Sequence, residues 1–207
     1  MTTTAPTAPD GADVGWLLLT YRVPTQSSRN RVAVWRELKR VGALYLQQAV
    51  CVVPDLPELV EAVRQIRDRI RELGGTSFSA RLVDLSADDH AQLVEGFRSN
   101  SERDYAEIVE ECETKFFKEI EFERFRKNYT FEEAEEIGQD LDKLRRWLTK
   151  VIARDWLSAG GRAEAEAKVD EAGRMFEEFE AEVFEQSGQA EPDDALSTSP
   201  AGSDRPD

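Results

Sequence analysis

The sequence predicts an α+β fold in which a small sheet domain precedes a helical module. Up to residue 85, apolar runs that end at proline or glycine alternate with amphipathic stretches of helical spacing. Beyond that point, long charged segments with helical periodicity take over. The Thr-, Ala-, Ser- and Pro-rich ends have little to bury and are expected to be disordered. We therefore expect four regions: a tail over 1–14, the α+β domain over 15–87, the helical module over 88–186 and a tail over 187–207.

The first predicted element is a strand over Trp16–Val23. Its three consecutive leucines favour burial on both faces, as in a central strand. Pro24 ends the strand because proline cannot donate to the ladder. In the polar turn Thr25–Asn30 that follows, Ser27 or Ser28 can cap the next helix.

The segment Arg29–Val41 has the spacing of an amphipathic helix, and Gly42 ends it. Its expected buried side is apolar and comprises Val32, Trp35 and Leu38, with Val34 and Val41 beside them. Its opposite side is basic and comprises Arg29, Arg36, Lys39 and Arg40.

Two short strands are expected within Ala43–Val53, on either side of Gln47-Gln48, and Pro54 closes the run. The turn between them lacks an Asn-Gly type of signal, so one long bent strand is an alternative.

A second helix is predicted over Leu56–Leu73, with Pro57 in its first turn and Gly74-Gly75 at its end. Its buried stripe is Leu59, Val63, Ile66, Ile70 and Leu73. Its exposed stripe includes Arg64, Arg67 and Arg71. The alternating segment Thr76–Leu85 is the last strand.

The resulting order, βαββαβ, is that of a ferredoxin-like domain, in which two helices pack on one face of a four-stranded antiparallel sheet. Because both helices lie on the same side, their outward faces are neighbours. Both outward faces are basic in this sequence.

The rest of the chain is expected to form an antiparallel helical bundle or hairpin. Ser86, with Asp89 three residues later, can cap its first helix. The expected helical segments are Asp88–Arg98, Glu102 to Asn128, Phe131 to Leu157 and Arg162 to Gln186, with a first break at 99–101. The apolar spacing is clearest in two sets, Leu141, Leu144, Leu148, Val151 and Ile152, and Met175, Phe176, Phe179, Val183 and Phe184.

The formal net charge of −15 is unevenly distributed. Residues 16–87 hold 11 Lys/Arg and 7 Asp/Glu, whereas residues 88–186 hold 15 Lys/Arg and 28 Asp/Glu. A basic module of net +4 is thus joined to an acidic module of net −13, which favours a polyanionic partner for the first module only.

No catalytic or metal-binding constellation is recognisable, so we expect a protein that is not an enzyme and needs no cofactor or metal. The one histidine, His90, opens a helix without a partner His or Cys and is expected at the surface. Cys51 is expected to be a buried, inert thiol, and it forms no CxxC pair with Cys112. Neither a signal peptide nor a long apolar run is present, so we expect a soluble cytoplasmic protein without a membrane partner.

The basic helix faces are the candidate nucleic-acid-binding surface, because arrays of cations hold phosphate backbones by releasing counterions. The candidate residues are Arg29, Arg36, Lys39, Arg40, Arg64, Arg67 and Arg71. The alternative is a solvated face whose charges pair with Glu37, Glu61 and Asp68.

A second basic cluster lies within the acidic module, and guanidinium groups suit oxyanions through their fork geometry. The candidate oxyanion-binding residues are Lys115, Lys118, Arg124, Arg126 and Lys127. The alternative is pairing with glutamates one helical turn away.

Several segments, in order, resemble the N-terminal region of the chromate resistance regulator family ChrB. They are WLLLTYRVP, then R-x-R-V-A-V-W-R-x-L-K-R-x-G-A-x-Y-L-Q-x-x-V-x-V-x-P, and later YTFEEAEEIGQDLDKLRRWLTKVIARDWL and GRAEAEAKVDEA. The resemblance covers residues 16–186. It implies a cytoplasmic regulator that binds promoter DNA, responds to the oxyanion chromate and controls a chromate efflux gene. Full-length members carry a further C-terminal domain, whereas this sequence continues into a tail, so we expect the helical module to serve another partner here.

The βαββαβ part is also similar to the middle domain of phenylacetate-pathway repressors and to CRISPR adaptation nucleases. Such a nuclease uses an acidic residue at the end of the first strand, where this sequence has Tyr21-Arg22. We therefore expect a transcriptional regulator, with a homodimer as a further expectation. The alternative is an interaction or dimerisation module of a chromate-resistance system that does not bind DNA.

Overall fold

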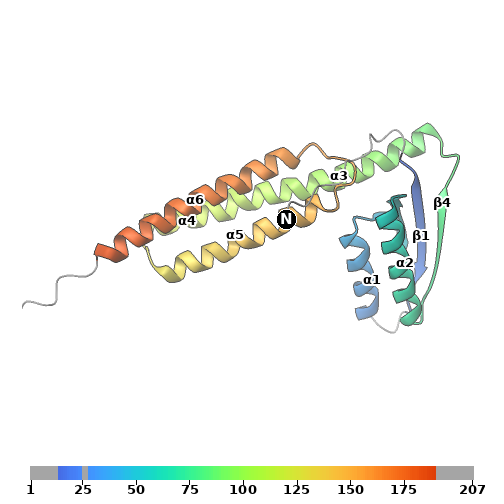
Figure 1. Cartoon of the computed structure of the whole chain (residues 1–207), viewed down its shortest axis with the longest axis horizontal. Coiled ribbons are helices and arrows are strands. Elements are labelled where there is room, and N and C mark those ends of the chain that lie inside the picture. The colour runs from blue at the N-terminus through green and yellow to red at the C-terminus, as the bar shows by residue number, and fades with distance from the viewer. Residues whose placement is uncertain (1–13, 25–27, 190–207) are drawn as a thin grey trace, which may run out of the picture.

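The computed structural model describes residues 14–24 and 28–189. A four-stranded sheet with two helices lies at one end, and a long helical module extends from it (Figure 1). The tails expected over 1–14 and 187–207 lie mostly outside the described residues, although the last helix continues as far as Gln189. None of the helices in the described part combines the length and apolar content that a membrane crossing requires.

The sheet is antiparallel throughout, with the strand order β2-β3-β1-β4. Its strands are β1 (Trp16–Arg22), β2 (Leu44–Gln47), β3 (Val50–Pro54) and β4 (Thr76–Leu82). In register, Leu18 of β1 lies between Val52 of β3 and Ala80 of β4. The prediction of a central first strand is confirmed, and this position explains why the consecutive leucines avoid water.

The segment after the first helix forms two strands, not one bent strand. Gln47 pairs with Val50, so only Gln48 and Ala49 connect β2 to β3. Ala49 has a φ of 60°, the left-handed conformation that Asn or Gly usually supplies in such a turn. The turn therefore forms although its left-handed position holds Ala and not Asn or Gly.

Helices α1 (Ser28–Arg40) and α2 (Pro57–Glu72) cover the same face of the sheet (Figure 1). The buried stripe predicted for α2 is confirmed at Leu59, Val63, Ile66 and Ile70. For α1 the prediction was partly wrong. Leu38 and Val34 point into the core, whereas Val32 and Trp35 remain 42% and 46% exposed, because α1 turns its Val34 side to the sheet.

The helical module begins with α3 (Ala87–Glu111), which Ser86 caps by accepting the backbone N–H of Asp89 at 3.0 Å. The break expected at 99–101 is wrong, because α3 runs straight through it. Phe97 and Tyr105, one turn to either side, are both buried and hold the helix in place. The helix continues through a π-helical segment, η2 (Cys112–Phe116), into α4 (Phe117–Arg126).

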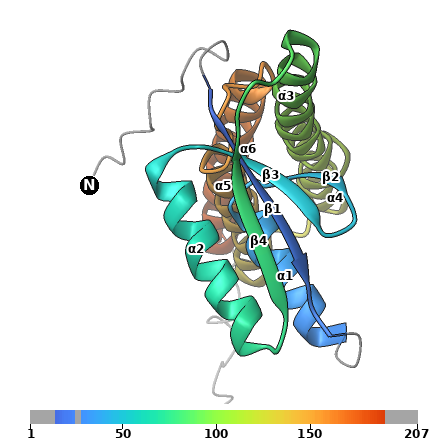
Figure 2. The same cartoon turned by 90° about the vertical axis from the view of Figure 1, so that its right-hand side faces the viewer.

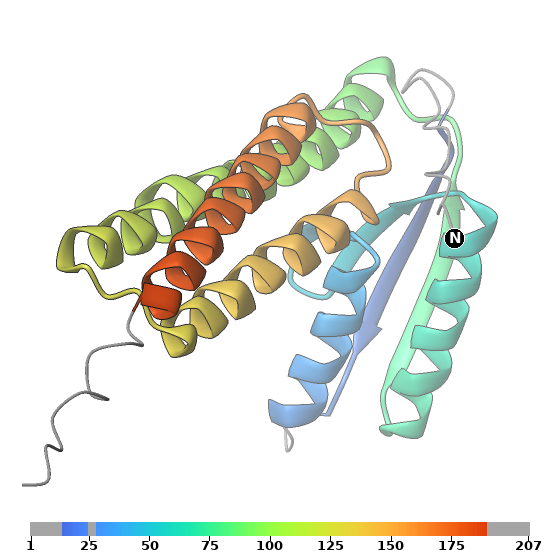
Figure 3. The ribbon, with the colours of Figure 1, turned by 60° about the vertical axis from the view of Figure 1, so that its left-hand side comes forward.

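Two further helices, α5 (Phe131–Ile152) and α6 (Arg162–Gln189), complete the module. The chain runs out along α3 and α4, returns along α5 and runs out again along α6, which gives an antiparallel arrangement (Figures 1 and 3). Leu141, Leu144 and Val151 are buried in its core, as their spacing predicts. Phe184, a member of the second apolar set, is 73% exposed.

The loop after α5 joins the module to the sheet domain. The sequence predicted helix as far as Leu157, but α5 ends at Ile152. The indole N–H of Trp156 donates to the carbonyl oxygen of Val41 at 3.1 Å, just beyond the end of α1. Gly42, with a φ of +74°, lies so close that a Cβ there would be 2.9 Å from the Arg154 carbonyl oxygen. The end of α1 is therefore fixed by the helical module.

The first turns of α3 cover part of the other face of the sheet. Trp16 of β1 stacks on Phe97 with ring centroids 5.3 Å apart. His90 is half-buried and not fully at the surface, since its ring lies 5.7 Å from that of Trp16. At the far end of the same face, Phe78 is 61% exposed, so α3 covers only one end (Figure 2 shows the sheet from this side of the molecule).

Candidate nucleic-acid interface

The basic face of α1 lies open to solvent. Its four candidate residues are exposed, and none forms an ion pair or hydrogen bond with another residue of the described part of the chain: Arg29, Arg36, Lys39 and Arg40. The helix has one carboxylate, Glu37, which pairs with none of them. These cations therefore keep their charge available to a partner.

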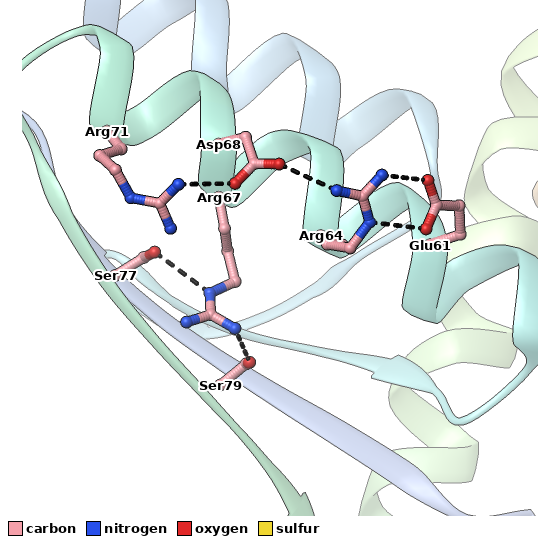
Figure 4. A network of polar contacts seen from close by, with 7 residues as sticks. All are labelled: Glu61, Arg64, Arg67, Asp68, Arg71, Ser77 and Ser79. Atoms are coloured by element: carbon pink, nitrogen blue, oxygen red, sulfur yellow. Dashed lines mark hydrogen bonds and ion pairs between the residues drawn. The ribbon is translucent and has the colours of Figure 1, made fainter.

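The basic face of α2 is arranged differently, as a chain of alternating charges along the helix (Figure 4). Arg64 forms a two-pronged contact with Glu61, from Nε to Oε2 at 2.8 Å and from Nη2 to Oε1 at 2.7 Å. Its remaining nitrogen donates to Asp68 at 3.0 Å. Arg71 donates to the other oxygen of Asp68 at 2.8 Å. The charge of both arginines is balanced within the helix.

The third α2 candidate, Arg67, points toward the sheet. Its Nη1 donates to Ser79 Oγ at 2.7 Å and its Nε donates to Ser77 Oγ at 3.3 Å, both on β4 (Figure 4). The side chain is half-buried. Arg67 therefore ties α2 to the edge strand and presents less of its fork to solvent than the α1 cations do.

The α2 pairing also changes the acidity of one carboxylate, Glu61. The hydrogen bonds from Arg64 and then Gln65 lower the pKa of Glu61 from 4.5 to about 2. Glu61 is consequently ionised at any physiological pH, and Arg64 keeps its counter-charge. Because both groups are exposed, the consequence is for charge availability more than for stability.

The structure brings the two helices side by side, as predicted, but it does not give them equivalent surfaces. The sequence contained the signal for this difference. Glu61, Arg64, Asp68 and Arg71 follow one another at spacings of three or four residues, at which charges on a helix meet. The helix α1 has no such ladder. Sequence reasoning also passed over Arg69, which pairs with Glu72 at 3.0 Å.

The five residues of the candidate oxyanion cluster lie along η2, α4 and the turn after it. Lys115 pairs with Glu111 at 2.6 Å and Lys118 pairs with Glu121 at 2.8 Å, within a turn of the same helix. Each contact satisfies one cation with its own carboxylate.

The other three members differ among themselves. Arg124 makes a two-pronged contact with Glu182 of α6, at 2.9 and 2.8 Å. Arg126 lies over the Phe122 ring at 5.2 Å. Lys127, in the left-handed conformation at the end of α4, forms no ion pair with another described residue. The oxyanion site stays a prediction that would require some of these pairs to open.

Comparison with known families completes the description of the site. Residues 31–190 match the model of a family described as "Protein ChrB, N-terminal". This match covers most of the chain and most of both the sheet domain and the helical module.

The chain belongs to the ChrB N-terminal family.

The resemblance inferred from the sequence is therefore confirmed. A curated relative, Protein ChrB of Cupriavidus metallidurans (strain CH34), is 37% identical over 51 residues. That stretch is 25% of this chain and 16% of the relative, so the matched region is a small part of a longer protein.

Proposed function

We propose that this protein is a transcriptional regulator of the chromate-resistance type that binds DNA through the exposed basic face of α1. One observation carries the proposal: Arg29, Arg36, Lys39 and Arg40 project from one helix without partners among the described residues. Each cation that meets a phosphate releases condensed counterions, which gives affinity without base readout. In this proposal the protein is not an enzyme and acts in the cytoplasm.

The sheet domain fits the ferredoxin-like class in this proposal. The βαββαβ order and the strand order β2-β3-β1-β4 support that assignment. In such a domain the sheet supports both helices, so α1 is held as a rigid rod with its basic side outward. Phosphate contacts made from such a helix would fix the register and orientation of the protein on the duplex.

The experiment is a titration of a labelled duplex from the upstream region of the protein's own gene, read by fluorescence anisotropy at several salt concentrations. We expect binding that weakens linearly on a plot of log K against log salt. A duplex of unrelated sequence measures the nonspecific part. Absence of binding to either duplex at low salt would remove the proposal.

A response to chromate is a second part of the proposal, supported by family membership. The residues offered for it are Lys115, Lys118, Arg124, Arg126 and Lys127. Calorimetric titration with chromate, sulfate and phosphate tests it. Heat from chromate that is lost when Lys127 and Arg124 are replaced by Gln supports this site, and no heat from any of the three oxyanions refutes it.

The alternative is a protein-interaction module, and a specific observation favours it. Four phenylalanines near the end of the helical module distant from the sheet are at least half exposed: Phe122, Phe125, Phe131 and Phe184. The ends of α4 and α6 and the start of α5 lie at this end (Figure 3). Light scattering of the parent and of a Phe125→Ser/Phe184→Ser variant distinguishes a homodimer formed through this end from a monomer.

A further inference from the structure

A groove between α1 and the β2–β3 hairpin is the largest concave feature described on the sheet domain that the proposed function does not use. Its volume is about 740 Å³. That size suits a small organic molecule, since such sites commonly measure a few hundred to a thousand Å³. The groove lies on the flank of α1, beside the basic face discussed above.

The walls of the groove are largely apolar. Val32 and Trp35, the two α1 residues that the core does not take, line it. Tyr21 and Tyr45 line the same groove as Trp35. Three aromatic side chains around one hollow suit a flat, apolar ligand.

The two tyrosines supply a polar feature within this apolar groove. Their hydroxyl oxygens are 3.0 Å apart, so one hydroxyl donates to the other. The accepting hydroxyl keeps its own proton, for which the described residues offer no acceptor. Burial raises the pKa of Tyr21 and of Tyr45, so both remain protonated at neutral pH and the pair has one O–H left to donate.

The charge of the groove indicates the sign of the ligand. Among the described residues, Arg22 and Arg31 line it and no carboxylate does. A guanidinium and a hydroxyl donor that line the same groove can together hold a carboxylate group.

We propose that the groove between α1 and the β2–β3 hairpin binds a small aromatic carboxylate, with its ring against Trp35 and its carboxylate toward the tyrosine hydroxyls and Arg22. This site is separate from the DNA contact, because it uses the flank of α1 and not the residues of its basic face. Ligand binding to the groove is measurable without DNA. The groove proposal can therefore fail while DNA binding stands, and DNA binding can fail while the groove proposal stands.

The test uses 2-naphthoate as the probe and 2-naphthalenemethanol as its uncharged match, titrated into the full chain by calorimetry. We expect naphthoate to bind at least about tenfold more tightly than the alcohol. We also expect the indole N–H signal of Trp35 to shift in the NMR spectrum of the complex, while the signal of Trp147 in the helical module stays in place.

Three variants assign the binding to the groove: Trp35→Ala, Arg22→Gln, and Tyr21→Phe with Tyr45→Phe. Each should weaken naphthoate by about tenfold or more, whereas Arg69→Gln on α2 should not. Thermal unfolding identifies any variant that has lost its fold. Arg22→Gln alters an exposed side chain and should keep the fold, so its naphthoate affinity then tests the proposal. No binding of naphthoate up to millimolar concentration, equal binding of the alcohol, or full affinity in the Arg22→Gln and Trp35→Ala variants would each overturn the proposal.

Discussion

The helices α1 and α2 lie on the same face of the same sheet and carry similar numbers of cations, five on α1 and four on α2. They differ in carboxylates, of which α1 has one and α2 has four. On α2, Glu61, Asp68 and Glu72 pair with arginines one helical turn away. On α1, the single carboxylate, Glu37, lies three residues before Arg40 but forms no ion pair with another described residue. The comparison teaches that the availability of charge depends on the spacing of opposite charges more than on the number of cations.

The largest expected effect comes from removing the α1 charge. An Arg36→Gln/Lys39→Gln/Arg40→Gln variant should lose about a hundredfold in affinity for duplex DNA, and its salt slope should become shallower by about 2.7. The matched control is Arg64→Gln/Arg69→Gln/Arg71→Gln on α2, which lowers the net charge by the same amount. We expect the control to lose less than about threefold, because its arginines already have counter-charges. Equal losses in the two variants would show that only net charge matters.

A second difference between the helices is the attachment of α1 to the helical module. Trp156→Phe removes the hydrogen bond to the Val41 carbonyl, and we expect it to lower the free energy of unfolding by about 1–2 kcal/mol. Denaturant unfolding measures this loss. Trp35→Phe, which alters a half-exposed indole on the same helix, is the control and should change stability by less than about 0.5 kcal/mol.

The α2 pairing can be opened by design. In a Glu61→Gln/Asp68→Asn variant the arginines lose their partners while keeping their positions, so α2 should begin to resemble α1. We expect duplex DNA to bind about threefold more tightly and with a steeper salt slope. A Glu58→Gln/Asp84→Asn variant raises the net charge equally without removing an ion pair between described residues, and it serves as the comparison. An unchanged DNA affinity in the Glu61→Gln/Asp68→Asn variant would mean that ion pairing is not what prevents the α2 arginines from binding DNA.

The smallest effect concerns pH. Because the folded-state pKa of Glu61 is lowered to about 2, its pairing with Arg64 should persist as the pH falls from 7 through 4.5, and should be lost only near pH 2. The carboxyl carbon signal of Glu61, followed by NMR, should therefore titrate far below 4.5. In an Arg64→Gln variant the midpoint should move back up toward 4.5, and a midpoint that does not move would contradict the pairing.

The sequence was sufficient for the order of elements and for most of the core. Periodicity and punctuation by Pro24, Gly42, Pro54 and Gly74 placed the elements of the sheet domain correctly, because local backbone chemistry dictates those ends. The family was also recognisable, since its motifs are spread over residues 16–186. The charge ladder of α2 was readable from spacing alone, although it was weighed only as an alternative.

What could not be predicted depends on contacts between distant segments. The rotation of α1, which leaves Val32 and Trp35 exposed, follows from how the helix meets the sheet and not from its own pattern. The end of α5 at Ile152 is followed by the hydrogen bond from Trp156 to Val41 of the sheet domain, a contact that no local pattern encodes. The Tyr21–Tyr45 pair joins two strands that are not neighbours in the sheet, so no local motif announces the groove.

The central claim is that α1, and not α2, is the surface that meets a polyanion. The most direct measurement is the change in backbone amide NMR signals when an unlabelled promoter duplex is titrated into the isotope-labelled protein. The account predicts that the largest changes follow Arg29–Arg40 and that the signals of Glu61–Arg71 change little. Changes centred on α2, or confined to the helical module, would contradict it.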